Sequence, residues 1–242
     1  MLTIMMVTFN RLDLTKKTLA NLTLQNVGVP FNLVIIDNGS TDGTIDFLKT
    51  LENTHIRYNE KNLGIGIGRN LGLIESAKFS NEFLCTLDND VILPDGWGKE
   101  CIDILNKAPG YGAIGVNFEG TRYPEIEISG IKFQNKPQGN LGTACMVFGK
   151  KLHKMLGFFN YEGIGLYGLE DSYFGCRIRA SGFKLGYLLK DGEHLGSGEN
   201  DVGEYRKFKT EEHNRYLAEF SKNCGDYYRR VKGVYVGFKD EV

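Results

Sequence analysis

The stretch Phe83-Leu84-Cys85-Thr86-Leu87-Asp88-Asn89-Asp90 decides the fold, because a short apolar run ends in two carboxylates. A run of this length, bounded by polar turn residues, predicts a buried strand over residues 83–88. Carboxylate oxygens at positions 88 and 90 suit a hard divalent cation such as Mg²⁺ or Mn²⁺, with substrate phosphates completing the coordination shell. An Asx-rich turn has the same composition, so the triplet needs support from the rest of the chain.

Other β-rich runs alternate with helix-period segments over the first 118 residues; these runs are residues 2–8, 31–37, 55–58 and 113–118. Between them, apolar residues recur at helical spacing, for example Leu12, Leu19 and Leu22, and Asp95 is the expected N-cap of the helix before the last run. This alternation predicts parallel βαβ units, and therefore an α/β fold with a mainly parallel central sheet flanked by helices. Ligands of such sheets bind beyond the carboxyl ends of the strands.

The second half of the chain is less regular. Residues 120–142 are polar and irregular, and the later predicted elements are a strand at 143–148, a helix at 169–180, a strand at 183–189 and a Gly-rich loop at 192–198. The last 40 or so residues are expected to be helical with a charged tail. Because no internal repeat and no Pro-rich linker interrupts the chain, we expect one domain over residues 1–242.

Composition limits the functional classes. The chain has 242 residues, 41% of them hydrophobic, and a formal net charge of -1, so no global field attracts it to nucleic acid or to anionic membranes. Its five cysteines are scattered and contain no C-x-x-C pair, which argues against a disulfide framework and a zinc knuckle. The sequence has no targeting segment and no apolar run of transmembrane length. We therefore expect a protein of the reducing cytoplasm.

Polar residues follow the other predicted strands. Thr8 and Asn10 follow the first, and Asp37 ends the second, before a turn of small polar residues. An acid there can accept hydrogen bonds from a nucleobase or ribose. The segment Asn62-Leu63-Gly64-Ile65-Gly66-Ile67-Gly68-Arg69 fails the dinucleotide fingerprint, because Arg69 stands where the third glycine is required. A Gly-rich helix entry can still bring backbone amides and Arg69 close to a phosphate.

Two further groups of candidate residues lie between positions 170 and 194. Glu170 and Asp171 begin a predicted helix, where carboxylates are often only favourable partners of the helix dipole. A carboxylate there can instead act as a general base, although a helix N-terminus lowers its pKa. His194 lies in a loop, where a lone histidine is most often structural, but a neutral imidazole can also ligate Mn²⁺ beside Asp90.

Taken together and in this order, the segments at 8–10, 34–42, 62–72, 87–90, 157–159, 170–171 and 177–184, with His194, resemble the family 2 glycosyltransferases of the GT-A fold. The resemblance covers residues 2–200. It implies a Rossmann-like nucleotide-sugar-binding half at 1–118 and a mixed acceptor-binding and catalytic half at 119–200, followed by the helical extension at 201–242. It also implies a nucleoside diphosphate sugar as donor and transfer with inversion to an acceptor hydroxyl.

The resemblance further implies roles for individual residues. Asp90 and His194 would hold the divalent metal, Mn²⁺ or Mg²⁺. Asp171 would be the general base, with Glu170 orienting the acceptor or the base. The residues expected to bind the donor are Thr8, Asn10, Asp37, Asn62, Arg69, Asp88 and Asn89. Asp37 suits uracil, which favours a uridine diphosphate sugar, but other bases can use a similar acid, so the nucleotide stays open. The usual acid after Gly157-Phe158 is missing, because Phe159-Asn160-Tyr161 follows.

Two other functions remain open from the sequence. A nucleotidyltransferase that makes sugar nucleotides shares the α/β plan, but it needs a Gly-rich basic loop after the first strand, where this chain has Thr8-Phe9-Asn10-Arg11. A non-catalytic module that binds a sugar nucleotide or glycan needs no general base. The acceptor class is also open: a saccharide, a lipid-linked sugar, a protein or a modified DNA base each offers a hydroxyl.

Overall fold

The computed structural model describes residues 1–162 and 165–196, together with 207, 211, 214 and 236–238. Its strands are β1 (Leu2–Thr8), β2 (Phe31–Asp37), β3 (Thr54–Tyr58), β4 (Phe83–Asp88), β5 (Val91–Ile92), β6 (Tyr111–Asn117), β7 (Glu125–Ile128), β8 (Ile131–Lys136), β9 (Cys145–Gly149), β10 (Lys184–Asp191) and β11 (Glu193–His194). Its helices are α1 (Leu12–Asn21), α2 (Leu24–Val27), α3 (Thr44–Leu48), α4 (Ile65–Ser76), α5 (Trp97–Lys107), α6 (Lys150–Leu156) and α7 (Glu170–Ala180).

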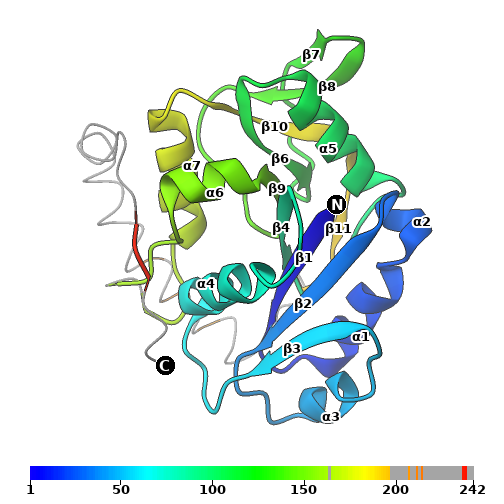
Figure 1. The fold of residues 1–242 in the computed structure, drawn as a ribbon, viewed down its shortest axis with the longest axis vertical. Helices are drawn as coiled ribbons and strands as arrows, with labels where there is room; N and C mark the ends of the chain where they lie inside the picture. The colour runs from blue at the N-terminus through cyan, green and yellow to red at the C-terminus, as the bar shows by residue number, and fades with distance from the viewer. Residues whose placement is uncertain (163–164, 197–206, 208–210, 212–213, 215–235, 239–242) are drawn as a thin grey trace.

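The described strands form one large sheet in the order β3-β2-β1-β4-β9-β6-β10-β8-β7 and a small sheet of β5 and β11 (Figure 1). The first four strands in this order pair in parallel. β9 then runs antiparallel to both β4 and β6, and β8 runs antiparallel to β10 and β7. The predicted α/β class is confirmed: a parallel half is followed by a mixed half.

Both faces of the sheet are covered, which explains why its central strands are apolar without alternation. Successive side chains of β1 point to opposite faces. Leu2, Ile4 and Met6 belong to the core cluster that contains Trp97 of α5, whereas Met5 packs in the cluster of Leu73 on α4. The parallel half is therefore a layer between helices, and the ends of its strands are the places left for polar residues.

A hairpin occupies part of the region that we expected to be irregular. β7 and β8 pair through the turn Ser129-Gly130, whose φ values are 52° and 78°. Positive φ at both central residues is the conformation of a type I′ turn. Two-residue hairpins favour this turn because its twist matches the right-handed twist of the paired strands. The alternation Glu125-Ile126-Glu127-Ile128 leaves the glutamates exposed and the isoleucines half-buried. Residues 120–142 are thus partly an antiparallel extension of the sheet.

The predicted N-cap of α5 is wrong. Gly96 occupies that position with a left-handed φ of 78°, while the side chain of Asp95 accepts a hydrogen bond from Asn26. The short elements α2, α6, β5 and β11 were not predicted, because runs this short carry little periodicity.

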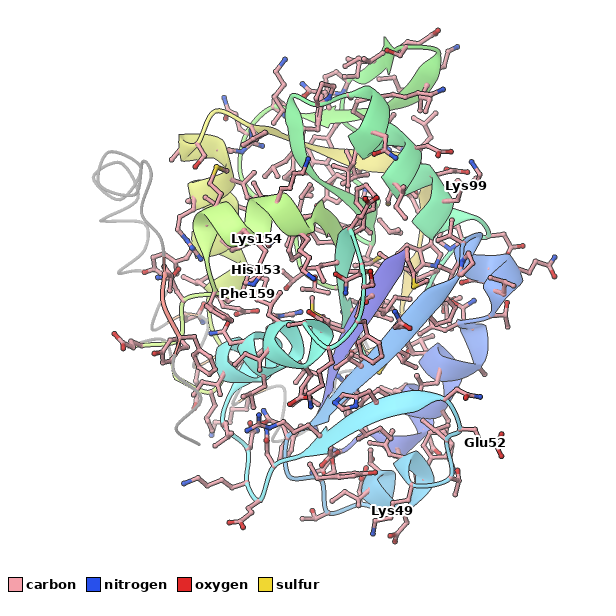
Figure 2. The ribbon with its side chains drawn as sticks, viewed as in Figure 1. Lys49, Glu52, Lys99, His153, Lys154 and Phe159 are labelled. Atoms are coloured by element: carbon pink, nitrogen blue, oxygen red, sulfur yellow. The ribbon has the colours of Figure 1, made fainter. Side chains whose placement is uncertain are left out.

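The end of α6 and the following loop pack against α4. Figure 2 shows His153, Lys154 and Phe159 on the side of the molecule where these two helices lie. The backbone of Phe159 makes two hydrogen bonds to the side chain of Asn70, at 2.8 and 3.0 Å. Val236 pairs with the same loop, where its carbonyl accepts from the amide of Phe158. Most of the predicted extension at 201–242 lies outside the described residues.

Two expectations from composition can be compared with the described residues. Cys85, Cys101, Cys145 and Cys176 are buried free thiols, in agreement with the absence of a disulfide pattern. Among the same residues, we find no helix that combines the length and the hydropathy needed to cross a bilayer.

Candidate functional site

A cavity of about 410 Å³ opens where β1, β4 and β6 end and α7 begins. Eight of the predicted site residues line it: Asn62, Arg69, Asp88, Asn89, Asp90, Glu170, Asp171 and His194. The other three, Thr8, Asn10 and Asp37, lie in its surroundings and do not form its wall. The cavity therefore unites residues from 62 to 194, as expected for a site beyond the carboxyl ends of parallel strands.

Asp88, Asp90 and His194 form a cluster with ligand atoms within 4.8 Å of one another. The small sheet makes this possible: β11 pairs with β5, which sets His194 opposite Val91, and the amide of Leu195 donates to the carbonyl of Asp90 at 2.7 Å. Nε2 of His194 lies 3.8 Å from Oδ1 of Asp90. Mg²⁺ lies about 2.1 Å from its ligands, so one ion can touch both atoms. Two carboxylates and an imidazole also suit Mn²⁺.

Arg11 is part of this cluster, although the sequence interpretation gave it no role. Its Nη1 lies 2.7 Å from Oδ2 of Asp90, whose side chain is only 5% exposed. Arg11 and the preceding Asn10 both have left-handed backbone conformations, with φ of 64° and 55°. Hydrogen bonds from Asn10 to Ser40 and from Thr41 to Asn10 hold this turn. The turn directs the guanidinium from the end of β1 to the end of β4.

Arg69 connects Asp88, a member of the Asp88, Asp90 and His194 cluster, to α7. This side chain is buried and projects from α4. Its Nη2 donates to Asp88 at 3.0 Å, its Nε to Glu170 at 3.1 Å and its Nη1 to the carbonyl of Thr143 at 3.3 Å. A buried carboxylate is tolerated when it is paired in this way. Arg69 was expected to lie near a nucleotide; it lines the cavity with its guanidinium held by two acids.

Glu170 is buried and Asp171 half-buried at the start of α7, and desolvation dominates the ionisation of both. Burial, and next the neighbouring Asp171 carboxylate, raise the pKa of Glu170 to about 8, although Arg69 acts in the opposite direction. Burial also raises the pKa of Asp171, against the effects of Arg69 and Ser172. The helix N-terminus alone predicts lowered pKa values, so desolvation outweighs the dipole here.

A hydrogen-bonded layer supports the part of the cavity wall formed by Asn89 and Asn62. Asn89 donates to the hydroxyls of Thr8 at 3.1 Å and Thr15 at 2.8 Å, so Thr8 acts through Asn89 rather than at the cavity wall. Asn62 accepts from Asn38 at 2.9 Å. The Asn62 interaction brings Asn38, a cavity-lining residue that the sequence reasoning did not single out, into the site.

Asp37 is fully buried at the end of β2. Its Oδ1 accepts hydrogen bonds from the amides of Gly39 and Ser40, which closes the turn after the strand. Its Oδ2 has no hydrogen-bond partner among the described residues. An oxygen of this kind is costly to bury, so a ligand group or water that donates to it would stabilise the site.

The glycines of residues 64–68 act mainly in packing. A Cβ on Gly66 would lie 2.8 Å from the carbonyl oxygen of Asn160, and one on Gly68 would lie 2.8 Å from Val7. Close packing of α4 against β1 and the loop before α7 therefore requires residues without side chains.

Further cavity-lining residues come from the irregular half of the chain and were missed: Asn117, Phe118, Glu119, Thr143, Tyr167 and Tyr187. Tyr187 stacks on Tyr123 with ring centroids 5.6 Å apart, and Lys136 donates to the hydroxyl of Tyr123. Charged and aromatic residues at the ends of strands indicate a candidate binding site in the sequence. These residues could be assigned to this cavity only once β10 was known to pair with β6.

Solved structures that are similar to this chain include glycosyltransferases of the GT-A fold. The mannosyltransferase PcManGT from Pyrobaculum calidifontis, solved with GDP-Man and Mn²⁺, matches with a TM-score of 0.64 at 16% identity, over 96% of this chain and 67% of that one. TarS of S. aureus matches with a TM-score of 0.61 at 18% identity, and the chain spans 42% of its length. A shorter TarS structure, residues 1–349 with UDP-GlcNAc, gives 0.58 at 17% identity, over 96% of this chain and 76% of that one.

These likenesses establish the fold, and sequence establishes the family. No curated protein matches the chain in sequence. The family model described as glycosyl transferase family 2 matches residues 3–152, which include β1, β4, the Asp88-Asn89-Asp90 triplet and Arg69. This match covers more than half of the chain, and the protein therefore belongs to glycosyl transferase family 2.

Proposed function

We propose that the protein transfers a sugar from a nucleoside diphosphate sugar to an acceptor hydroxyl, with inversion at the anomeric carbon. One observation carries this proposal: a metal-ligand cluster and a pair of enclosed carboxylates line the same cavity, on the two sides of Arg69. Family membership supports glycosyl transfer, and the two sets of acids supply the two groups that such a reaction needs.

The donor half of the site would bind the nucleotide. Asp90, His194 and Asp88 would hold a divalent metal, Mn²⁺ or Mg²⁺, which neutralises charge on the departing diphosphate. The side chains of Asn62 and Asn89 would form part of the wall of the nucleoside pocket. Thr8 and Asn10 would hold the loops behind that wall in place. Asp37, expected to bind the base, lies behind the cavity wall, so it would support the turn that presents Asn38 to the cavity. Two of the structural neighbours were solved with GDP-Man and UDP-GlcNAc, so guanine and uracil nucleotides are the donors to test first.

The acceptor half of the site would remove the hydroxyl proton. As the new bond to the anomeric carbon forms, the Asp171 carboxylate takes the proton of the attacking hydroxyl. Its raised pKa makes it a stronger base than an exposed aspartate. Glu170, held by Arg69, would orient the acceptor or Asp171. Attack from the side opposite the leaving diphosphate inverts the anomeric centre in a single displacement.

A screen of nucleotide sugars tests the proposal. Uridine and guanosine diphosphate sugars are each incubated with the protein and Mn²⁺, and the released nucleoside diphosphate is measured with and without a chelator. We expect metal-dependent release from at least one donor, and loss of metal-dependent nucleotide binding in Asp90→Ala. If the wild-type protein binds nucleotide sugars but releases no diphosphate with any acceptor class, a binding module is the better interpretation. Pyrophosphate release from a nucleoside triphosphate and a sugar phosphate would instead indicate a nucleotidyltransferase.

A further inference from the structure

The position of Arg11 suggests a role that the proposed chemistry does not itself require. Arg11 is the N-cap residue of α1, where the positive end of the helix dipole disfavours a cation, and it makes no side-chain cap. The Arg11 side chain therefore does not stabilise its own helix. Its guanidinium instead lies 2.7 Å from Asp90, one of the candidate metal ligands.

The surroundings of Asp90 explain why a cation is needed there. The Asp90 side chain is 5% exposed, and an ionised carboxylate so deeply buried requires a partner. Gly196 packs directly against the pair: a Cβ at that position would lie 2.1 Å from Nη2 of Arg11 and 2.2 Å from Oδ2 of Asp90. Arg11 thus supplies a positive partner for Asp90 from within the chain.

A bound divalent ion changes this electrostatic balance. Oδ1 of Asp90 faces His194 at 3.8 Å and Oδ2 faces Arg11 at 2.7 Å, so an ion between Asp90 and His194 would lie close to the guanidinium. Two positive groups on one enclosed carboxylate repel each other in this low-dielectric setting. A diphosphate that enters the cavity would offset this repulsion, because its negative charge attracts both the metal ion and the guanidinium of Arg11.

The two cavity-lining arginines differ in exposure and in their place on the backbone. Arg69 is 5% exposed at its side chain and donates to Asp88, Glu170 and the Thr143 carbonyl. Arg11 is 19% exposed at its side chain and projects from a loop rather than from the middle of a helix. Arg11 is therefore the guanidinium that can turn from a carboxylate to a phosphate.

We propose that Arg11 is a resident counter-cation that weakens metal binding in the donor-free protein and strengthens donor binding once the metal is present. It thereby couples the two ligands, so that metal and nucleoside diphosphate bind well only together. This inference rests on the proposed function, because it assumes that Asp90 and His194 hold a divalent ion. Arg11 acts in ligand binding, and the reaction itself does not require it to exchange a proton.

The test compares wild type with Arg11→Met in two titrations by calorimetry: MnCl₂ alone, and UDP or GDP at saturating Mn²⁺. We expect Arg11→Met to bind Mn²⁺ alone more tightly and the nucleotide more weakly, each by roughly 5- to 150-fold. Arg11→Lys keeps the charge and should fall between wild type and Arg11→Met in both titrations. Lys17→Met, at an exposed position of the same helix, is the matched control and should change neither affinity.

The test is decisive because Arg11→Met is expected to raise the affinity for Mn²⁺ alone and to lower the affinity for the nucleotide. Weaker Mn²⁺ binding by Arg11→Met would overturn the inference, since Arg11 would then orient Asp90 for the metal instead of competing with it. Unchanged values in both titrations would also overturn it. If wild type binds neither Mn²⁺ nor nucleotide, the proposed function fails before Arg11 is tested. Thermal melting without metal shows whether each variant is folded, and Arg11→Lys keeps the comparison available if Arg11→Met is not.

Discussion

The guanidinium of Arg69 lies 3.1 Å from the carboxylate of Glu170, although 101 positions separate the two residues in the chain. The same guanidinium reaches Asp88 at 3.0 Å. One buried side chain on α4 thus ties the end of β4 to the beginning of α7. Loss of this contact should affect folding as well as activity.

Arg69→Met should lower the free energy of unfolding by about 1–3 kcal/mol, because it leaves Glu170, Asp88 and the Thr143 carbonyl without the hydrogen bonds that the guanidinium donates. Urea denaturation measures this change. Lys49→Met is the control: Lys49 and Asp46 are 3.5 Å apart, but their side chains are 62% and 86% exposed, and removal of such a pair should cost less than about 1 kcal/mol. Equal effects of the two variants would contradict the structural role assigned to Arg69.

Glu170→Gln should change how stability depends on pH. The pKa of Glu170 is raised from 4.5 to about 8, so between these values the folded protein retains a proton that the unfolded chain has lost. Stability from this group is therefore present at low pH and lost as the pH rises through this window, by up to about 1.4 kcal/mol per pH unit. We expect the free energy of unfolding of Glu170→Gln, measured by denaturation at several pH values, to change less with pH than that of wild type. The control Glu127→Gln, at an exposed position, should show the same pH dependence as wild type.

Asp171→Asn should reduce kcat by about 10²–10⁴-fold while nucleotide affinity stays the same, because the amide cannot accept the acceptor proton. In wild type, kcat/KM should fall on the acid side at a higher pH than for an exposed aspartate, since burial raises the pKa of Asp171 and protonation removes the base. Released nucleoside diphosphate measured across pH tests both statements. Asp46→Asn, at an exposed position, is the control. Full turnover by Asp171→Asn would assign the base to another residue.

Gly66→Ala should destabilise the protein, in contrast to most replacements of glycine by alanine within helices. Helix propensity alone favours alanine by about 1 kcal/mol. The added Cβ would, however, meet the carbonyl oxygen of Asn160 at 2.8 Å, and we expect a net loss of about 1–3 kcal/mol. Gly110→Ala has nothing within 4 Å of its Cβ and should change stability by less than about 0.5 kcal/mol. Melting temperatures of the two variants measure the difference.

The parallel half of the fold could be predicted because its strands are buried on both faces and therefore appear as apolar runs. The prediction of residues 83–88 as a strand is confirmed, and so is that of residues 2–8. The hairpin β7–β8 was missed although Ser129-Gly130 is a hairpin turn between alternating residues. β7 has exposed glutamates and β8 contains the polar residues Lys132, Gln134, Asn135 and Lys136, so the composition of the segment resembled that of a loop.

Residues that line the cavity were predictable where each follows a strand or begins a helix, as Asp90 and Asp171 do. The partners of those residues were not. The contact between Arg11 and Asp90 depends on two successive left-handed residues, and the burial that raises the pKa of Asp171 depends on packing between distant segments. Neither feature can be derived from the order of residues alone, because both arise only when α1, β4 and α7 are placed together.

The strand order also determines where the protein can be altered with the least effect on its chemistry. β7 is at the outer edge of the sheet, and β9, β6, β10 and β8 separate it from β4, which ends at Asp88. The exposed Glu125 and Glu127 place charge along this edge, which discourages pairing with a strand of another molecule. A fluorescent label, a surface tether or a randomised library at these two positions would leave every proposed metal ligand and the base on unmodified elements.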